Sequence, residues 1–427
     1  MTNLPQSAFR AWLLVALFLC ASQLKANARF TTDREAIDRV IELIDRRLAL
    51  MPEVAAGKFR QQKPIADPAR EHEVIEQSSA DAEAIHLDRT AAEAFFSAQI
   101  ALARAVQTQL FEDWRSRHET PPATRDLATQ IRPQLDAIGR GLLTAVYLAS
   151  TALSDVPAAT LHERTTRLLH HPGATQALLD DLARALVAMR ITADATWDSV
   201  QRVGALRVGT TGDYAPFSDD HGGTLRGIDV HLAEDVAKSW GVTVVFVHTS
   251  WPTLMQDLER RRFDLAASGI SITPERAQHA DFSTPYIFDG KMPIARRENA
   301  ARYSSLESVD QPGVRVIVNP GGTNERFVRE HLNQATIVVH PDNRTIFDEI
   351  VAGRADLMIT DSIEVRLQSR RHPELQATVA EPFTRVGKAI LLPHRSDLTP
   401  RVDAWLAPKI AHGEVTEAVA DELSRTP

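Results

Sequence analysis

The feature that most constrains this chain is a change of pattern around residues 196–205. Before it, from Thr32 to about Arg190, apolar residues recur at helical spacing. After it, short apolar strands alternate with helical segments. The first pattern is typical of an all-α bundle, and the second of an α/β fold with parallel strands. Because 427 residues exceed one ordinary domain, we predict a multidomain protein with a helical domain over residues 29–195, a linker over 196–205 and a two-lobed α/β domain over 206–427.

The first 28 residues resemble an export signal. Arg10 precedes the apolar run 11–20, and Ala26-Asn27-Ala28 fits a small-x-small cleavage site. The run is too short for a transmembrane helix, so we expect no stable membrane anchor. Removing residues 1–28 takes away two cations and no acid, which changes the formal net charge from -8 to -10. This acidic balance argues against nucleic acid as a partner.

The only cysteine, Cys20, lies in the same segment, so the mature chain would contain none. This usage suits an oxidising compartment, and we predict a secreted, periplasmic protein. It also excludes disulfides, thiolate nucleophiles and cysteine-ligated metals from the mature chain. The 15 histidines show no metal-ligand spacing, so we expect no metal site.

Two carboxylates follow a predicted strand near the end of the α/β region. Leu357–Ile359 reads as a short buried strand, with Asp361 and Glu364 just beyond it. Ligands of open α/β sheets bind at the carboxyl ends of strands. The two carboxylates could hold an ammonium group, or one could stay protonated and act as a general acid. The alternative is an ordinary helix start, with Asp361 as N-cap and Glu364 completing a capping box.

Three loops that leave predicted strands also carry groups suited to a ligand. They cover residues 212–217, 268–276 and 319–325. The third opens a helix, whose free N–H groups attract a carboxylate, although Gly-Gly before a helix is also a common turn. Its spacing fits neither a Walker loop nor a dinucleotide fingerprint.

In this order, with Asp361 to follow, the loops resemble the periplasmic amino-acid-binding proteins across nearly all of residues 204–427. The resemblance implies that Tyr214 covers the ligand and that Asp361 pairs with its ammonium group. It implies that the ligand carboxylate is held by four residues: Gly269, Ser271, Arg276 and Thr323.

The second carboxylate, Glu364, makes the chain similar to cyclohexadienyl dehydratases, together with the segments 249–252, 289–291, 319–325 and 366–370. That family is a binding-protein fold turned enzyme, which converts prephenate to phenylpyruvate, or arogenate to phenylalanine, by loss of water and carbon dioxide. No cofactor is needed because aromatisation drives the reaction. A closing, desolvated cleft should raise the pKa of Glu364, which would then protonate the leaving hydroxyl.

The resemblance implies further roles around the same cleft. Arg276, Ser271 and the loop Gly322-Thr323-Asn324 would orient the substrate carboxylates. Trp251 would wall the ring, and Lys291 would add a cation.

In the helical region, several polar residues fall on faces that should be apolar. Arg47 and Lys58 are eleven residues apart and would share a face if the helix continued through Pro52. Gln107 lies on the apolar side of a predicted helix over residues 88–114. The alternative is that each is simply a solvated side chain.

As a set, six of these residues fit the spacing of the all-helical chorismate mutases: Arg47, Lys58, Asp67, Arg70, Glu71 and Gln107. Residues 33–114 resemble the secreted subclass of that family, which rearranges chorismate to prephenate without a cofactor. The resemblance implies that Arg47 and Arg70 clamp the two carboxylates, and planar guanidinium groups suit that task. Lys58 and Gln107 would donate hydrogen bonds to the ether oxygen.

The resemblance implies two further roles, and the chain departs from the family pattern at two positions. Glu71 would accept a hydrogen bond from the ring hydroxyl, and Asp67 would position its neighbours. Ala103 stands where the family often has a hydroxyl residue, and Val74 where a Gln sometimes occurs. Arg140 is a candidate for a further cation from the later helices.

The sequence therefore predicts a bifunctional enzyme of phenylalanine biosynthesis, because the product of the first site is the substrate of the second. Its partners would be the small molecules chorismate, prephenate and arogenate. The alternative is a periplasmic amino-acid-binding protein with a catalytically silent helical domain. Glu364 distinguishes the two, since a pure binder has no use for a protonated acid there. The sequence leaves open whether the chain forms a homo-oligomer.

Overall fold

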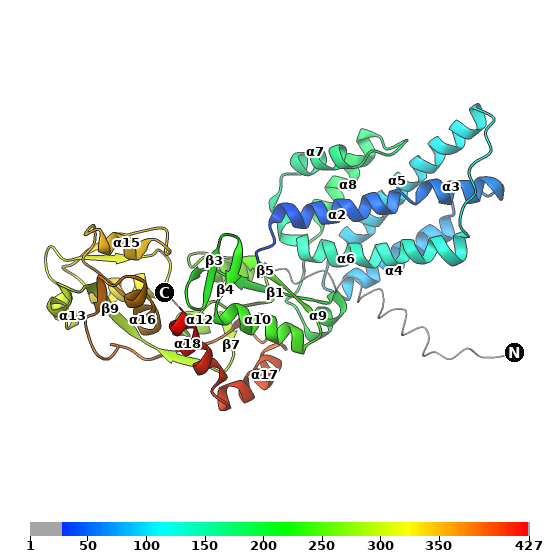
Figure 1. Ribbon diagram of the computed structural model, residues 1–427. Coiled ribbons are helices and arrows are strands. Elements are labelled where there is room, and N and C mark those ends of the chain that lie inside the picture. The colour runs from blue at the N-terminus through cyan, green and yellow to red at the C-terminus, as the bar shows by residue number, and fades with distance from the viewer. Residues whose placement is uncertain (1–27, 426–427) are drawn as a thin grey trace.

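The computed structural model describes residues 28–425, which form a helical bundle beside a two-lobed α/β region (Figure 1). The predicted signal segment, apart from Ala28, lies outside the described residues. The bundle consists of α2 (Asp33–Leu48), α3 (Met51–Arg60), α4 (Pro68–Glu83), α5 (Arg89–Ser116), a π-helical turn (Leu127–Ile131), α6 (Arg132–Asp155), α7 (Ala158–Leu168) and α8 (Gln176–Ala188).

The bundle is built on the apolar stripe of α2. Thr32 and Glu35 form the capping box that starts this helix, and Ile37, Ile41 and Ile44 are buried against the other helices. The helix ends at Leu48, and Pro52 lies in the first turn of α3. Arg47 and Lys58 therefore lie on two successive helices, because the helix does not continue through the proline.

The first α/β lobe contains a five-stranded sheet in the order β5-β1-β6-β15-β7. Its strands are β1 (Ala205–Thr210), β5 (Thr243–His248), β6 (Leu265–Ala266), β7 (Ala280–Phe282) and β15 (Leu391–Pro393). The strands β5, β1 and β6 are parallel, whereas β15 is antiparallel to β6 and β7. The helices of this lobe are α10 (Ile228–Ser239), α11 (Leu254–Glu259), α12 (Pro274–Ala277), α17 (Thr399–Ala411) and α18 (Glu414–Arg425).

The second lobe repeats this plan with the order β11-β10-β12-β9-β13. Its strands are β9 (Lys291–Arg296), β10 (Arg315–Val318), β11 (Thr336–Val339), β12 (Leu357–Asp361) and β13 (Leu375–Ala377). Its helices are η2 (Ala300–Arg302), α13 (Leu306–Val309), α14 (Thr323–His331), α15 (Ile346–Val351) and α16 (Ser362–Arg371). The strand β9 runs antiparallel to β12 and β13. The sheets are thus mixed, whereas the sequence pattern predicted a parallel plan. The pattern did not reveal that β9 and β15 run antiparallel to their neighbours.

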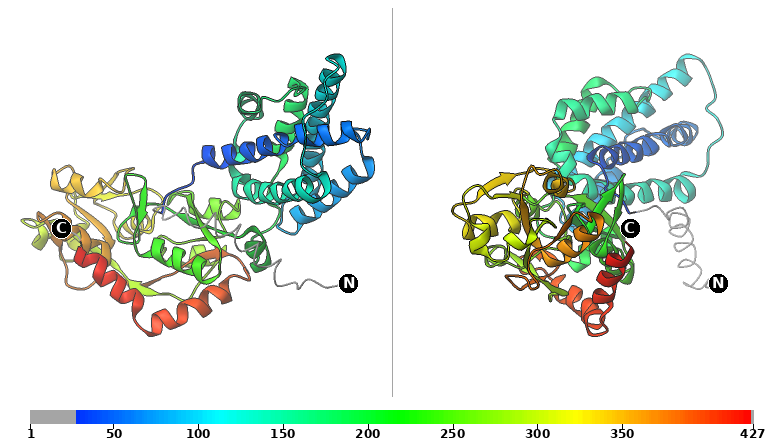
Figure 2. Two further views of the ribbon diagram at one scale, coloured as in Figure 1. Left: turned by 45° about the vertical axis from the view of Figure 1, so that its right-hand side comes forward. Right: turned by 60° about the vertical axis from the view of Figure 1, so that its left-hand side comes forward.

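A two-stranded ribbon connects the lobes. The chain leaves the first lobe through β8 (Ile287–Asp289) and returns through β14 (Val386–Lys388), and these strands pair antiparallel. A small sheet of β2 (Asp213–Tyr214), β3 (Ser218–His221) and β4 (Thr224–Arg226) extends from the first lobe. After the ribbon, α17 and α18 finish the chain along the first lobe, in red in Figure 2.

The two regions meet in a structured junction. The segment 196–205, predicted as a linker, contains α9 (Trp197–Val203) and the first residue of β1. Residues 28–31 belong with the α/β region, since Phe30 pairs with Phe246 and the N–H of Thr31 donates to the carbonyl of Phe246 at 3.2 Å. The first described residues thus lie beside β5, and the chain then enters the bundle. Among the described helices, none has the length and apolar character needed to cross a membrane.

Candidate active sites

The six bundle residues singled out by the sequence line one cavity of about 150 Å³, which we call the bundle cavity. It lies among α2 to α6 and the π-helical turn. The residues are Arg47, Lys58, Asp67, Arg70, Glu71 and Gln107. They come from four helices and one loop, so the fold gathers groups that are up to 60 positions apart.

The cations of the bundle cavity are partly removed from water. Burial lowers the pKa of Arg47, while the charge of Asp136 acts in the opposite direction. Burial is also the largest cause of the lowered pKa of Lys58, which nearby Asp67 partly offsets. The Lys58 ammonium donates to the carbonyl of Ile65 at 2.5 Å. An anionic ligand would therefore meet poorly solvated cations, whose attraction is strong at low local dielectric.

The turn before α4 fixes the acidic side of the cavity. Asp67 is the N-cap of α4 and accepts from the N–H of Arg70 at 3.4 Å, while its own N–H donates to Glu71 at 3.2 Å. This exchange holds both carboxylates at the helix start. Arg70 itself is bonded to Glu73 at 2.7 Å and to Asp136 at 3.4 Å.

Gln107 is buried on α5 beside Met51. Its amide nitrogen donates to the carbonyl of Ala103 at 3.1 Å, and its amide oxygen has no hydrogen-bond partner among the described residues. Ala103 and Val74, the two departures from the family pattern, both line the cavity. The cavity thus has apolar side chains at the two positions where the family pattern has a hydroxyl or an amide.

The structure adds three charged residues that the sequence analysis did not single out. Arg104, Arg132 and Asp136 line the same cavity. Arg140, the predicted extra cation, is exposed and does not line it. Arg132 begins α6 directly after the π-helical turn. The spacing of residues in the sequence does not indicate such a turn, so the position of Arg132 could not be predicted.

The second site lies between the two α/β lobes, and we call it the interlobe cleft. The cavity left there is only about 20 Å³, so the side chains of the two lobes nearly fill it. It is lined by Tyr214, Trp251, Gly269, Ser271, Arg276, Asn319, Gly322, Thr323, Asn324, Asn343, Asp361 and Lys388. Nine of these are residues that the sequence predicted; the other three, Asn319, Asn343 and Lys388, are additions.

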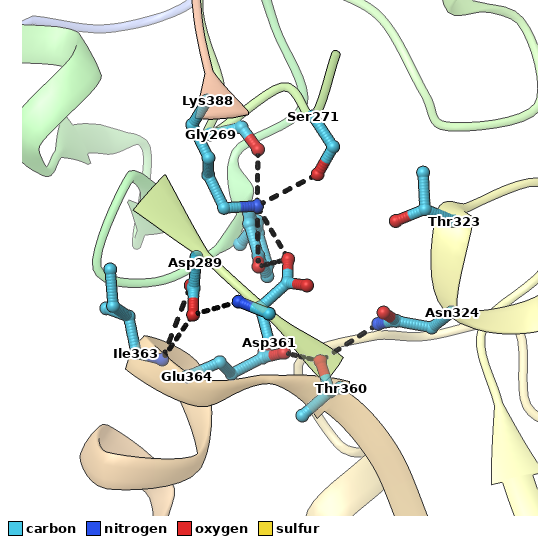
Figure 3. A network of polar contacts seen from close by, with 12 residues as sticks. Gly269, Ser271, Asp289, Thr323, Asn324, Thr360, Asp361, Ile363, Glu364 and Lys388 are labelled. Atoms are coloured by element: carbon cyan, nitrogen blue, oxygen red, sulfur yellow. Dashed lines mark hydrogen bonds and ion pairs between the residues drawn. The ribbon is translucent and has the colours of Figure 1, made fainter. Parts of the chain in front are cut away.

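Asp361 is the centre of a buried ion network (Figure 3). Its Oδ1 accepts from Lys291 at 2.7 Å, and its Oδ2 accepts from Lys388 at 2.6 Å and from the Tyr214 hydroxyl at 2.5 Å. These cations hold the pKa of Asp361 well below its usual range despite burial. Asp361 was predicted to await the ammonium group of a ligand; in this structure it is already bonded to two ammonium groups of the chain itself.

Lys388 is the main residue that sequence reasoning missed. It is 1% exposed, and its ammonium also contacts the Gly269 carbonyl at 2.9 Å and the Ser271 hydroxyl at 3.2 Å. It lies on β14, one of the two strands that connect the lobes. A strand of three residues is too short to show a periodic pattern in the sequence. The only available signal was a lysine among apolar neighbours.

Glu364 is 2% exposed and lies in the first turn of α16. It accepts a hydrogen bond from the Thr360 hydroxyl, which in turn accepts from the Asn324 amide at 2.9 Å. Burial raises the pKa of Glu364 to about 8, and the charge of Asp361 adds to this rise. The direction is the one that the sequence predicted. Glu364 also lines a second cavity, of about 1200 Å³, beside β2–β4.

The capping-box alternative for this stretch is wrong. Asp361 makes no side-chain capping bond at the start of α16. Asp289 on β8 does so instead, accepting from the Ser362 hydroxyl at 2.6 Å and from the N–H of Ile363 at 3.3 Å. Because Asp289, a residue of the connecting ribbon, caps the helix, Asp361 is free to join the ion network. For the same reason Glu364 is free to remain a buried acid.

The first lobe contributes the expected carboxylate-binding groups. Burial lowers the pKa of Arg276 to about 10, and its guanidinium donates to the carbonyl of Ser271 at 3.0 Å. The N–H of Gly269 donates to Asp229 at 2.6 Å, so a buried carboxylate fixes this loop. The ring of Trp251 meets that of Tyr214 edge to face at 5.5 Å. These rings form an aromatic wall beside the charged groups.

In the second lobe, Thr323 and Asn324 open α14. Lys291 donates to the Thr323 hydroxyl at 2.8 Å and to the amide oxygen of Asn324. Lys291 therefore connects the start of α14 to Asp361. Lys291 and Glu364 do not line the interlobe cleft themselves, but lie directly behind its wall. Among the described residues, no cluster of His, Asp or Glu is arranged to hold a metal ion.

Two lobes joined by a ribbon, with an ion-lined cleft between them, define the class of this protein. Residues 206–420 match the bacterial extracellular solute-binding proteins, family 3, and residues 34–108 match chorismate mutase type II. The chain belongs to the family 3 solute-binding proteins and carries a chorismate mutase type II region before them.

Particular relatives narrow this class. A protein named cyclohexadienyl dehydratase from Pseudomonas aeruginosa is 51% identical over 235 residues, covering 53% of this chain and 87% of that protein. The L-cystine-binding protein TcyJ of Escherichia coli K12 is 29% identical over 224 residues, covering 51% of this chain and 83% of that protein.

The same part of the chain resembles solved structures. The ancestral amino acid-binding protein AncCDT-1, described as a precursor of cyclohexadienyl dehydratase, is 33% identical with a TM-score of 0.50. That match covers 53% of this chain and 98% of AncCDT-1. A variant of ArgBP from T. maritima is 26% identical with a TM-score of 0.50, covering 54% of this chain and 99% of ArgBP.

Proposed function

We propose that this chain is a bifunctional enzyme. It rearranges chorismate to prephenate, and it then converts prephenate to phenylpyruvate or arogenate to phenylalanine. The observation that carries the proposal is Glu364, a buried carboxyl with a pKa raised to about 8 beside a ligand-binding cleft. A protein that only binds amino acids gains nothing from a protonated acid there. The chorismate mutase type II match and the 51% identical dehydratase support the same pairing of activities.

In the bundle cavity, the reaction requires that chorismate be held in a compact shape while a C–O bond breaks. Arg47 and Arg70 would bind the two carboxylates, with Arg70 exchanging its bond to Asp136 for the substrate. Lys58 and Gln107 would donate to the ether oxygen as negative charge develops there. Asp67 and Glu71 would fix the turn and accept from the ring hydroxyl.

Once the lobes have opened to admit the substrate, Glu364 at the wall of the interlobe cleft would give its proton to the ring hydroxyl, which leaves as water. The electron pair of the bond to the ring carboxylate completes the aromatic ring, and that carboxylate leaves as carbon dioxide. Glu364 then needs one proton from solvent for each turnover. The 1200 Å³ cavity that it also lines offers a wet route for this proton.

The other cleft residues would orient the substrate. Arg276, Ser271 and the N–H groups at the start of α14 suit the carboxylates. Tyr214 and Trp251 would pack against the ring. Because the cleft in this structure is nearly filled, binding requires the lobes to open and close about the ribbon of β8 and β14.

The domain organisation belongs to the proposal. We assign a cleaved signal peptide to residues 1–28, the mutase to 29–195, a junction to 196–205 and the dehydratase to 206–427. The mature enzyme would act in the periplasm, which agrees with a family of extracellular solute-binding proteins.

The test is two single-substrate assays on the purified mature protein. Chorismate should be converted through prephenate to phenylpyruvate, and prephenate alone should yield phenylpyruvate well above its spontaneous decay. A thermal-shift screen with common amino acids tests the alternative. If prephenate binds without turnover and amino acids stabilise the protein strongly, the α/β region is a binder and the proposal fails.

A further inference from the structure

The first α/β lobe stands between the two proposed sites (Figure 1). The interlobe cleft lies beyond the carboxyl ends of the strands of this lobe, because the loop of Tyr214 follows β1 and the loop of Gly269 follows β6. The bundle meets the opposite end of the same sheet. There the hydroxyl of Tyr147, from α6, donates at 3.3 Å to Asp264, which directly precedes β6.

Within the bundle, the cavity lies at the end that is remote from the first lobe. Arg132 and Asp136, which line the cavity, stand at the start of α6. Tyr147 and Asp155, which contact the first lobe, lie further along the same helix. At the helical rise, Asp136 is about 16 Å from Tyr147 and about 28 Å from Asp155 along the helix. Prephenate would therefore form well away from the junction.

The junction between the bundle and the first lobe is tightly packed. Arg207 bonds to Asp264 at 2.6 Å beneath the ring of Tyr147, and all three side chains are buried. Val203 and Ala205, where the first lobe begins, belong to the apolar core of the bundle. A tunnel for a dicarboxylate would have to cross this core, which is filled by apolar side chains and a closed ion pair.

The rim of the junction does not favour a surface route for an anion. Arg262 bonds to Asp155 at 3.0 Å, and Arg261 bonds to Asp194 at 3.0 Å. Both arginines are thus neutralised by carboxylates of the bundle and of the segment after it. Prephenate carries two carboxylates, and the chain has a formal net charge of -8. Guidance of an anion along a surface requires a continuous positive field.

Opening of the cleft does not bring the sites together, because the buried anchor of the bundle lies on the first lobe. The second lobe has an equivalent ion pair, in which Arg315 on β10 bonds to Asp356 at 2.8 Å. In both pairs the backbone N–H of the arginine also donates to the carboxylate at 2.8 Å. The side chain of Arg315 is 38% exposed and that of Arg207 is 2% exposed, since Tyr147 covers the pair of the first lobe.

We propose that the bundle and the first lobe form one rigid body, and that prephenate leaves the bundle cavity into solvent before it enters the interlobe cleft. This inference rests on the proposed function and adds how its two steps are connected. Prephenate made by this chain is then open to any other enzyme that consumes it. Prephenate from another source can likewise enter the second step.

The kinetic test gives the mature protein ¹³C-labelled chorismate together with a tenfold excess of unlabelled prephenate. Mass spectrometry follows the labelled fraction of phenylpyruvate and of free prephenate over time. A released intermediate mixes with the pool, so the labelled fraction of phenylpyruvate should follow that of free prephenate and rise after a lag. Labelled phenylpyruvate that appears without a lag, in a fraction above that of the pool, would overturn the inference.

A mixture of Lys58→Ala and Glu364→Gln proteins is the matched control. Prephenate must leave one chain and enter another in this mixture, so it gives the time course expected for complete release. At matched concentrations of the two active sites, the wild type should reproduce this labelled fraction within about twofold. A larger excess of label in the wild type would show that the intermediate is retained.

A distance measurement tests the rigid body without any turnover. The mature chain is expected to lack cysteine, so introduced pairs of cysteines can carry spin labels. Glu112→Cys in α5 with Lys238→Cys in α10 reports the distance from the bundle to the first lobe. Glu112→Cys with Glu330→Cys in α14 reports the distance to the second lobe. The first distribution should be narrow and unchanged by phenylpyruvate, whereas the second should shift.

The two equivalent ion pairs supply the variants for this measurement. Arg207→Ala should broaden the distribution between the bundle and the first lobe, and Arg315→Ala, the matched control, should leave it narrow. A broad or ligand-dependent first distribution in the wild type, or no effect of Arg207→Ala, would overturn the rigid body. An absence of turnover of chorismate or prephenate would instead count against the proposed function, because these distances are measured without it.

Discussion

At the scale of single residues, the two sites depend on the protonation of particular groups. The proton of Glu364 is held by burial and by the neighbouring charge of Asp361. Gln107 is a neutral amide and donates at any pH. The first site should therefore need no protonated carboxyl, whereas the second depends on one.

The pH dependence of the dehydratase should follow Glu364. Only the protonated acid is active, so kcat/KM for prephenate should be level below about pH 8 and fall tenfold per unit above it. Glu364→Gln should lower kcat by about 10²–10⁴-fold at all pH values. Steady-state rates from pH 6 to 10, corrected for spontaneous decay, measure this. A level profile up to pH 10 would exclude Glu364 as the acid.

The same raised pKa predicts a change in stability. Relative to Glu364→Gln, the stabilising contribution of neutral Glu364 is complete below its ordinary pKa of 4.5. It is lost as the pH rises through the folded-state pKa of about 8. The difference in melting temperature between the wild type and Glu364→Gln should therefore shift against the wild type between pH 5 and 9. A constant difference would contradict a raised pKa.

Gln107→Glu should make the mutase acid-dependent. The new carboxyl would lie near Arg47 and Lys58 and would ionise at neutral pH, which removes the hydrogen-bond donor. Chorismate consumption at pH 7.5 should fall at least tenfold and recover towards pH 5. The wild type measured over the same range is the control. Equal loss at both pH values would point to a packing defect instead.

At the scale of elements, the connecting ribbon holds the dehydratase site together. Gly290 follows β8, and a Cβ there would lie 1.7 Å from the carbonyl oxygen of Thr384. Gly290→Ala must therefore displace the segment between Asp289, which caps α16, and Lys291. Prephenate turnover should fall at least a hundredfold while mutase activity persists. Gly141→Ala in α6, whose Cβ meets nothing within 4 Å, is the control and should leave both activities intact.

The same elements show what the sequence could and could not predict. Helical spacing from Thr32 onward and the apolar strand before Asp361 are local signals, so the helical nature of the bundle and the position of β12 were predicted close to what is observed. Lys388 was missed because β14 is three residues long and pairs only through the tertiary fold. The sequence left open the alternative in which Asp361 caps α16 for a similar reason: the residue that caps the helix, Asp289, is 73 positions away from Ser362.

At the scale of the whole molecule, a buried charge pair joins the bundle to the first lobe. Arg207 on β1 is bonded to Asp264 at 2.6 Å, and the guanidinium lies over the ring of Tyr147 from α6 at 4.5 Å. The Tyr147 hydroxyl donates to Asp264 at 3.3 Å. The sequence predicted two domains, but no local pattern indicated that they share this contact.

Breaking this pair should destabilise the junction. Arg207→Ala leaves Asp264 buried without its partner, which costs about 3–5 kcal/mol of unfolding free energy. Arg207→Met combined with Asp264→Leu removes both charges and should recover most of that loss. Calorimetric unfolding measures both variants. If the double variant is as unstable as Arg207→Ala, the cost does not come from an unpaired charge.

The central claim is that one chain carries two successive activities, and a mixing experiment tests it most directly. Chorismate is the only substrate supplied, and phenylpyruvate formation is followed. The samples are the Lys58→Ala protein alone, the Glu364→Gln protein alone, and a mixture of these two single variants. Each variant alone should produce almost no phenylpyruvate, Glu364→Gln should accumulate prephenate, and the mixture should restore the full conversion because each protein supplies the step that the other lacks. If the mixture stays inactive while the wild type is active, these two residues do not divide the reactions between the bundle cavity and the interlobe cleft. If the wild type itself makes no phenylpyruvate from chorismate, the bifunctional account is wrong.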